Sequence, residues 1–153
     1  MGRAGGNAQG GPDPSSVVRE FVRASNAWDT AAMFGLLAPD FVDHTPSPGQ
    51  GEGARAFIDQ KLADLRAAFP DVELTVDDEL VDGERIAWRW TLRGTNLGPL
   101  AGYPATGREV EFGGVNIEVV ANGRVVEHWS VYDSLQMLQQ LELFRWGEGQ
   151  SDP

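Results

Sequence analysis

Residues 69–98 read "FPDVELTVDDELVDGERIAWRWTLRGTNLG", and their hydrophobic pattern decides the fold. After Pro70 apolar residues alternate with polar ones, and this period of two is typical of a strand with one buried face. Asp82-Gly83 is a hairpin turn signal, and the arm that follows alternates again, with apolar residues at Ile86, Trp88, Trp90 and Leu92. The stretch therefore predicts an antiparallel hairpin.

A second hairpin is predicted at residues 109–133, around Asn122-Gly123. A two-residue turn would pair Asn116 with Trp129, whereas a three-residue turn would pair Asn116 with Ser130. Because a slip of one residue moves every side chain to the other face, the periodicity alone leaves both registers open. The segment between the hairpins, "GTNLGPLAGYPATGR", is rich in Gly and Pro and predicts a long loop of the kind that is usually functional.

Helices are predicted before the strands. Asp13-Pro14 and Asp29 are N-cap signals for two helices. Residues 51–71 keep helical spacing until Pro70 stops the helix, and residues 40–46 form a short extended piece before it. A final amphipathic helix follows the last strand. Segregated helices and antiparallel strands predict an α+β domain, in which a strongly bent sheet wraps around the N-terminal helices and encloses a pocket.

Composition limits the function. The chain has 153 residues, a net charge of −11 and no cysteine, so thiol catalysis and disulfides are excluded, and nucleic-acid or anionic-membrane binding is disfavoured. We expect one domain at residues 15–146, with disordered tails at 1–14 and 147–153. No apolar run approaches the length of about 20 residues that spans a bilayer, so we expect a cytoplasmic protein.

Three fragments of the sequence carry a family resemblance: "FVDHTP" at 41–46, the stretch at 69–98, and "PATGREVEFGGVNIEVVANGRVVEHWSVYDSLQMLQQL" at 104–141. Together they resemble the SnoaL-like polyketide cyclases, which have the NTF2-like cone fold, over most of residues 15–143. The resemblance implies a homodimer or higher oligomer and a pocket without a cofactor. We expect no metal site, because the chain has only two histidines, His44 and His128. It also implies acid–base chemistry on polyketide intermediates, commonly an aldol ring closure.

The sequence departs from this family at three polar positions. Ser130 stands where the family has an aspartate, its general acid/base, directly after the last-strand tryptophan. Asn116 stands where a histidine is frequent, and Asn96 replaces the histidine of a "GTH" motif. A serine hydroxyl cannot act as a base at neutral pH without a partner that takes its proton, so we expect a cyclisation other than the usual aldol reaction.

The resemblance favours the register that pairs Asn116 with Ser130. In that register Asn116, His128, Ser130 and Tyr132 share one face, as a polar pocket wall that would bind a carbonyl or enolate oxygen. The alternative is an exposed polar face with Trp129 and Val131 inside. We name His44, Asn116 and Ser130 as candidate catalytic residues, with His44 or His128 moving the proton because histidine titrates near neutrality.

Other candidates have a plainer alternative. By resemblance Arg89 lines the pocket, but it could equally form an outer-face ion pair with Asp77. Asp133 could face the pocket or cap the last helix, and "DSLQ" fits a cap. We expect Trp88, like His128 and Tyr132, to contact substrate. We expect Asp43 to point outward or to cap a turn, because it alternates with His44.

The sequence thus predicts a cofactor-independent cyclase or isomerase (or lyase) of secondary metabolism, for instance antibiotic biosynthesis. Its partner would be an apolar polyketide-like small molecule. The alternative is a non-catalytic module for small-ligand binding or dimerisation, and the missing aspartate favours it. Turnover, as opposed to binding alone, distinguishes the two.

Overall fold

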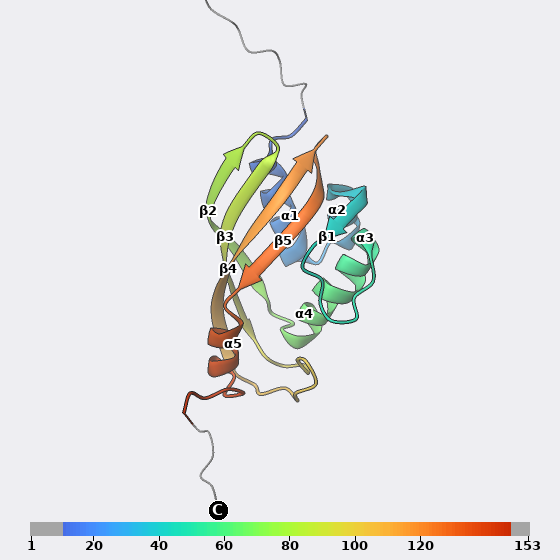
Figure 1. Ribbon diagram of the computed structural model, residues 1–153. Helices are drawn as coiled ribbons and strands as arrows, with labels where there is room; N and C mark the ends of the chain where they lie inside the picture. Colours follow the sequence, from blue (N-terminus) through green and yellow to red (C-terminus); the bar gives the residue numbers. More distant parts are fainter. Residues whose placement is uncertain (1–10, 148–153) are drawn as a thin grey trace, which may run out of the picture.

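A computed structural model of the protein describes residues 11–147, and within them the strands form one curved, unclosed sheet (Figure 1). Its strands are β1 (Leu37–Asp43), β2 (Glu73–Asp82), β3 (Arg85–Thr95), β4 (Glu109–Ala121) and β5 (Arg124–Tyr132). They lie in the order β1-β5-β4-β3-β2. The α+β prediction is confirmed. The pairing is antiparallel from β2 to β5, as expected, whereas β1 pairs in parallel with β5.

The first two helices begin where the caps predict. In α1 (Pro14–Ala27) the Asp13 side chain accepts a hydrogen bond from the Ser16 amide. In α2 (Thr30–Leu36) Asp29 caps the Ala32 amide in the same way. Each cap satisfies one of the amides that a helix start leaves without an intrahelical partner. Most of the predicted N-terminal tail, residues 1–10, and most of the C-terminal tail, residues 148–153, lie outside the described residues.

The long predicted helix is present, but its middle is a π-helical turn. It runs as α3 (Gly53–Ala56), the π turn η1 (Phe57–Leu62) and α4 (Ala63–Ala68). Helix α1 packs against the concave face of the sheet, mainly on β2, and α3 packs on β1 (Figure 1). A π turn inserts one residue per turn, and such turns occur frequently at functional sites. Here it carries Phe57 and Lys61, which both face the interior cavity.

The strand pairing in the first hairpin departs from the simple alternation of apolar and polar residues. Its turn closes between Asp82 and Arg85, and the register shifts at Asp77. This bulge inserts one residue, so the side chains beyond it change faces. Glu79 consequently points inward and pairs with Arg19 of α1 at 2.6 Å. The alternation after Pro70 puts Leu80 on the apolar face with Val76, but its side chain is 74% exposed.

The core lies between the concave sheet face and the helices. It is formed by buried apolar side chains from every layer, among them Val18, Val22, Met33, Phe41, Ile58, Phe69, Ile86, Trp88, Leu92 and Val125. The last helix, α5 (Ser134–Gln140), continues from β5 and packs on β4 through Met137 and Leu141. The helices therefore cover one face, and the outer sheet face is left open.

Asn96 fastens the long loop between β3 and β4 to the helical layer. Its side chain is fully buried, and its amide nitrogen donates to the carbonyls of Ala68 (3.3 Å) and Gly98 (2.8 Å). Its amide oxygen accepts from the Thr106 amide (2.8 Å) and hydroxyl (3.0 Å). This position of the "GTN" stretch is therefore a structural clamp at the base of the loop.

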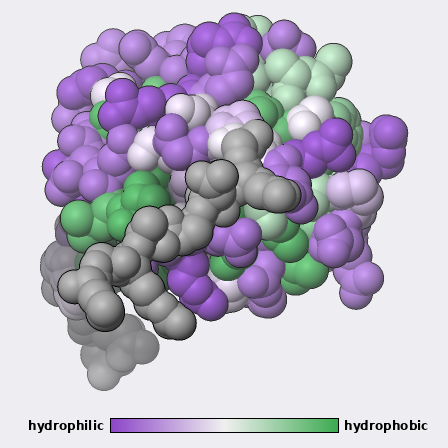
Figure 2. Space-filling view, turned by 90° about the horizontal axis from the view of Figure 1, so that it is seen from above, coloured by the Kyte–Doolittle hydropathy of each residue, from purple (hydrophilic) through white to green (hydrophobic). Residues whose placement is uncertain are grey.

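Seen from above, the end of the molecule that carries the hairpin turns is mostly hydrophilic, with apolar side chains in separate patches (Figure 2). This surface agrees with the strongly acidic composition. None of the helices within residues 11–147 has the length and apolar character needed to cross a membrane.

We predict that Asn96→Ala lowers the free energy of unfolding by about 3 kcal/mol, because it leaves buried loop and helix groups without hydrogen bonds. Urea denaturation followed by tryptophan fluorescence measures the change. Gln139→Ala, an exposed substitution in α5, is the control and should change the free energy by less than about 0.5 kcal/mol. Equal, small effects of both variants would contradict the clamp.

Candidate functional site

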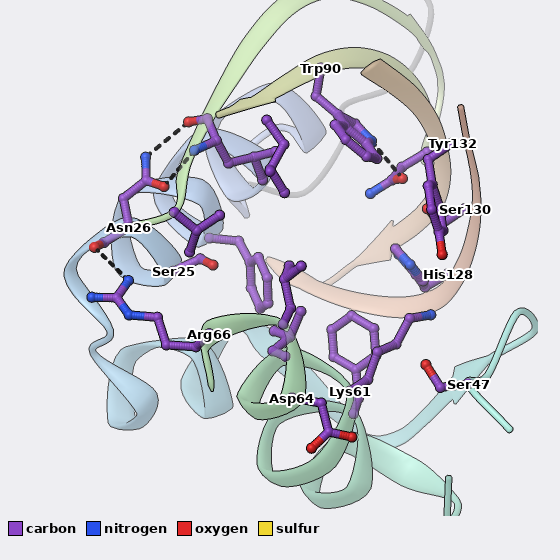
Figure 3. Close-up of a pocket in the computed structure, with 18 of the residues that line it drawn as sticks. Ser25, Asn26, Ser47, Lys61, Asp64, Arg66, Trp90, His128, Ser130 and Tyr132 are labelled. Atoms are coloured by element: carbon purple, nitrogen blue, oxygen red, sulfur yellow. Dashed lines mark hydrogen bonds between the residues drawn. The ribbon is translucent and has the colours of Figure 1, made fainter. Parts of the chain in front are cut away.

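The concave face of the sheet and the helices enclose a cavity of about 260 Å³. Apolar side chains from α1, β1, η1, α4, β2 and β3 form most of its wall, and Leu100 of the long loop closes one side. Polar side chains are gathered at a few places, shown in Figure 3. A mostly apolar cavity with few convergent polar groups is the usual form of a small-molecule site.

A bulge in β5 determines which polar groups reach this cavity. The turn is a two-residue one, closing between Ala121 and Arg124, with Asn122 and Gly123 both at positive φ. The register then shifts, and Asn116 pairs with Ser130. The predicted pairing is confirmed, but it arises from a tight turn followed by a bulge, because the two-residue turn alone would have paired Asn116 with Trp129.

A buried Glu118–His128 pair is the most polar feature of this wall. The two residues are cross-strand partners, and His128 Nδ1 lies within hydrogen-bond distance of Glu118 Oε1, at 3.0 Å. Less than a tenth of either side chain is exposed. A carboxylate only accepts hydrogen bonds, so an ionised Glu118 holds the proton of a neutral His128 on Nδ1. The lone pair of such a ring is then on Nε2, where a general base needs it.

The imidazole of His128 is fixed from its other sides by aromatic rings. Phe57 of the π turn contacts it edge-on, with ring centroids 5.0 Å apart, and Phe41 lies at 6.5 Å. Packing and the carboxylate together hold the ring in one orientation, as preorganised catalysis requires.

Asn116 presents a hydrogen-bond donor to the cavity. Its amide oxygen accepts the indole N–H of Trp90 at 2.9 Å, and it is buried. Because an indole nitrogen only donates, this contact fixes the amide orientation and leaves the Nδ2 hydrogens for the cavity side. Gly114 makes room for the Trp90 ring, since a Cβ there would lie 2.3 Å from its Cζ2.

Ser130 and Tyr132 continue the same wall, next to His128 (Figure 3). The Ser130 amide donates to the Thr45 hydroxyl at 2.9 Å, which fastens β5 to the segment after β1. Tyr132 is about half exposed and stands near the opening. Asn116, His128, Ser130 and Tyr132 therefore line one cavity, as the sequence predicts, and so does Trp88.

The structure does not bring His44 to this wall, and its predicted grouping with Asn116 and Ser130 is wrong. Asp43 pairs with His128 in the parallel β1–β5 ladder, so the next residue points to the outer face. There the His44 ring stacks on Trp129 (centroids 4.2 Å apart) and Nε2 lies 3.0 Å from Glu127 Oε1.

Asp43 takes the inward position instead, although it was expected to point outward or to cap a turn. It does accept a capping bond from the Thr45 amide, but only 3% of its side chain is exposed. Lys61 Nζ lies 2.9 Å from its Oδ2. Burial raises the pKa of this carboxyl, but hydrogen bonds from Lys61, Gln50 and the Thr45 amide outweigh it and hold the pKa below the ordinary value.

Arg89 and Asp133 do not line the cavity, so the structure does not place them where their predicted contacts with substrate require. Arg89 alternates with the inward Trp88 and Trp90, and on the outer face it pairs with Asp77 at 3.2 Å. The outer-face ion pair predicted as its alternative role is therefore present. Asp133 accepts the Gln136 amide at 2.8 Å and caps α5, so the cap alternative is confirmed.

Sequence reasoning missed Glu118 and the two cations that line the cavity, Lys61 and Arg66. Glu118 had a signal, because it stands two residues after Asn116 and opposite His128 in the preferred register. Lys61 also had a signal, because it keeps the helical spacing of Phe57, Leu62 and Leu65. Arg66 had none, because it reads as a solvent-facing charge of that helix. Within residues 11–147, no cluster of three or more His, Asp or Glu side chains is placed to hold a metal ion.

Comparison with known proteins places the chain in a family. The profile of the SnoaL-like polyketide cyclases matches residues 15–141, so the chain belongs to that family, and its fold is the NTF2-like cone. No curated protein matches it.

Solved structures agree with this assignment. IdmH from Streptomyces antibioticus, described as "a putative polyketide cyclase", is 32% identical, with a TM-score of 0.77 over 86% of this chain and 99% of its own. AclR from Streptomyces galilaeus, "a putative hydroxylase", is 28% identical (TM-score 0.75, 86% and 96% covered). TsrD from Streptomyces laurentii is 27% identical (TM-score 0.76, 85% and 95% covered).

We predict that Asp43 stabilises the fold above its unfolded-state pKa of about 3.9, and that this contribution disappears as the pH falls through the lower folded-state value. Asp43→Asn should therefore cost about 2 kcal/mol at pH 7 and less at pH 3. Urea denaturation of both proteins at the two pH values measures this. A difference that stays constant with pH would refute the assignment.

Proposed function

We propose that the protein is a cofactor-independent enzyme that cyclises or isomerises a polyketide-derived molecule in secondary metabolism. The observation that carries the proposal is the buried Glu118–His128 pair on the wall of an apolar cavity. A buried titratable pair of this kind in a cavity is a typical feature of active sites. Family membership supports the substrate class.

In this proposal the chemistry begins at a carbonyl of the substrate. The Asn116 amide and the Ser130 hydroxyl donate hydrogen bonds to its oxygen, while His128 Nε2 removes a proton from the adjacent carbon. The enolate oxygen keeps both donors, and Glu118 balances the imidazolium that forms. The enolate carbon then attacks a second electrophilic carbon, whose π bond breaks as the ring closes, and the anion that forms takes the proton back from His128. If the enolate instead takes that proton at another position, the reaction is an isomerisation.

This mechanism differs from that of the family in its acid–base residue, because Ser130 replaces the usual aspartate. The acid–base role that the family assigns to an aspartate after the last-strand tryptophan would fall here to His128, on the same strand and face. The cavity would supply the remainder by holding a flexible chain close to its reactive conformation, which can lower a barrier by several kcal/mol. A ring closure other than the aldol reaction is compatible with this arrangement.

A ligand-binding role without turnover is the second candidate, and the replacement of the aspartate by Ser130 favours it. A role in dimerisation alone fits less well, because the tryptophan and phenylalanine side chains leave the cavity of about 260 Å³ unfilled. The activity of histidine variants separates catalysis from binding.

We predict that His128→Asn lowers kcat for ring closure of a polycyclic or polyene polyketide at least about 100-fold, and Glu118→Gln about tenfold. Steady-state kinetics by chromatography measures both. His44→Asn removes the other histidine, on the outer face, and is the matched control that should stay within twofold. Binding without turnover in the wild type would favour the second candidate, and equal loss in both histidine variants would contradict the role of His128.

The homodimer implied by the family stays a prediction, for which we propose the outer sheet face. Val115, Ile117 and Val131 are 43–73% exposed there, in a continuous apolar strip across β4 and β5. Burying such a strip favours association.

Ile117→Asp should therefore convert a dimer to a monomer, as measured by sedimentation velocity. Leu97→Asp, at a residue of the long loop that is 60% exposed, is the control and should leave the dimer intact. A wild-type monomer, or a dimer unaffected by Ile117→Asp, would contradict this interface.

A further inference from the structure

We propose that the ligand of this cavity carries a carboxylate, and that Arg66 binds it at the rim opposite the His128 wall. The inference deepens the proposed function and rests on it in one respect, since it takes the cavity to be the ligand site. It names the chemical class of the substrate as an acid whose reacting carbonyl lies at its other end.

Arg66 differs from the other cation that lines the cavity. Lys61 is satisfied by Asp43 and by the Thr45 carbonyl, at 2.9 and 2.7 Å. Arg66 has no carboxylate of the described residues within 4.0 Å, although Asp64, which also lines the cavity, lies only two positions before it. An arginine at a cavity rim in a chain of net charge −11 has many acidic groups available, so the lack of an ion pair leaves its charge for a ligand.

The position of the guanidinium is fixed in advance. Its carbon lies 5.6 Å from the centre of the Trp28 ring, and one nitrogen donates to the Asn26 carbonyl over a long 3.4 Å. Asn26 is itself fixed, because its side chain makes two hydrogen bonds of 2.9 Å with the Leu74 backbone. A guanidinium has five N–H donors in a planar fork, so most remain for a carboxylate.

The cavity has polar groups at two opposite ends, and the Arg66 guanidinium lies at the outer rim beside the Asn26 carbonyl (Figure 3). Ser25, Asn26 and Arg66 lie on one side, and His128, Ser130 and Tyr132 lie on the other (Figure 3). Apolar side chains such as Phe21, Leu65 and Trp88 occupy the wall between them. This arrangement fits an elongated apolar molecule with an anionic group at one end and a ketone or enol at the other.

The overall charge makes a local cation necessary. A strongly acidic protein repels an anion in solution, and an apolar cavity removes its hydration. A carboxylate therefore enters only where a charge-assisted hydrogen bond compensates both costs. A plainer role for Arg66 is to stabilise the end of α1 through the Asn26 carbonyl, as cations do at helix C-termini. Ligand charge distinguishes the two roles.

The test uses two probes of equal shape, naphthalene-2-carboxylate and naphthalene-2-carboxamide, titrated by calorimetry at pH 7. We expect Arg66→Gln to weaken carboxylate binding about tenfold or more and to change carboxamide binding less than twofold. Arg66→Lys, which keeps the charge but loses the fork, should lie between. Arg85→Gln removes an exposed arginine outside the cavity and is the charge-matched control, with both affinities unchanged.

Each contrary outcome has a distinct meaning. Carboxylate binding that is insensitive to Arg66→Gln, or equal losses for both probes together with a lower unfolding midpoint, would overturn the anion site and leave Arg66 as a helix cap. Carboxamide binding to the wild type would still support the cavity as a ligand site in that case. If neither probe binds the wild type, the anion site and the ligand-binding role of the cavity are both contradicted.

Discussion

The register between β4 and β5 is the constraint on which the site depends. A two-residue turn at Asn122-Gly123 provides the tight reversal that a twisted hairpin favours, but by itself it would turn Asn116 toward Trp129. The bulge next to it inserts one residue and moves the pairing so that Glu118 meets His128 and Asn116 meets Ser130. All later consequences follow from that shift, because it decides which side chains face the cavity and which face the outer surface.

The side chains that face the cavity fix one another's orientation. Glu118 fixes the imidazole of His128, and the π turn supplies Phe57 against its face. Trp90 orients the Asn116 amide, and Gly114 leaves space for Trp90 to do so. On the outer face the same alternation produces the opposite result, since His44 stacks on Trp129 and pairs with Glu127. The two histidines acquire different surroundings because the parallel β1–β5 ladder places Asp43, and not His44, beside the inward His128.

The strand pattern predicted much of the fold. The alternation after Pro70 and the helix caps at Asp13 and Asp29 follow from local spacing. The shared face of Asn116, His128, Ser130 and Tyr132 came from the family resemblance, because the periodicity left both registers of the second hairpin open. The two bulges could not be predicted, because the hydrophobic pattern does not show where one residue is inserted. The bulge in β2 accounts for the exposure of Leu80. His44 was misplaced because its strand pairs in parallel with β5, which local spacing does not reveal. Arg66 was missed because its role is inferred from the absence of a nearby carboxylate among the described residues, which only the three-dimensional structure shows.

The central claim is that His128, held by Glu118, faces the ligand while His44 does not. Long-range proton–nitrogen NMR of the two imidazoles tests it directly, because it follows each ring nitrogen separately. On addition of naphthalene-2-carboxamide the account predicts a shift of the His128 Nε2 signal, with Nδ1 of the neutral ring protonated and the His44 signals unchanged. A shift at His44 with His128 unaffected would contradict the account.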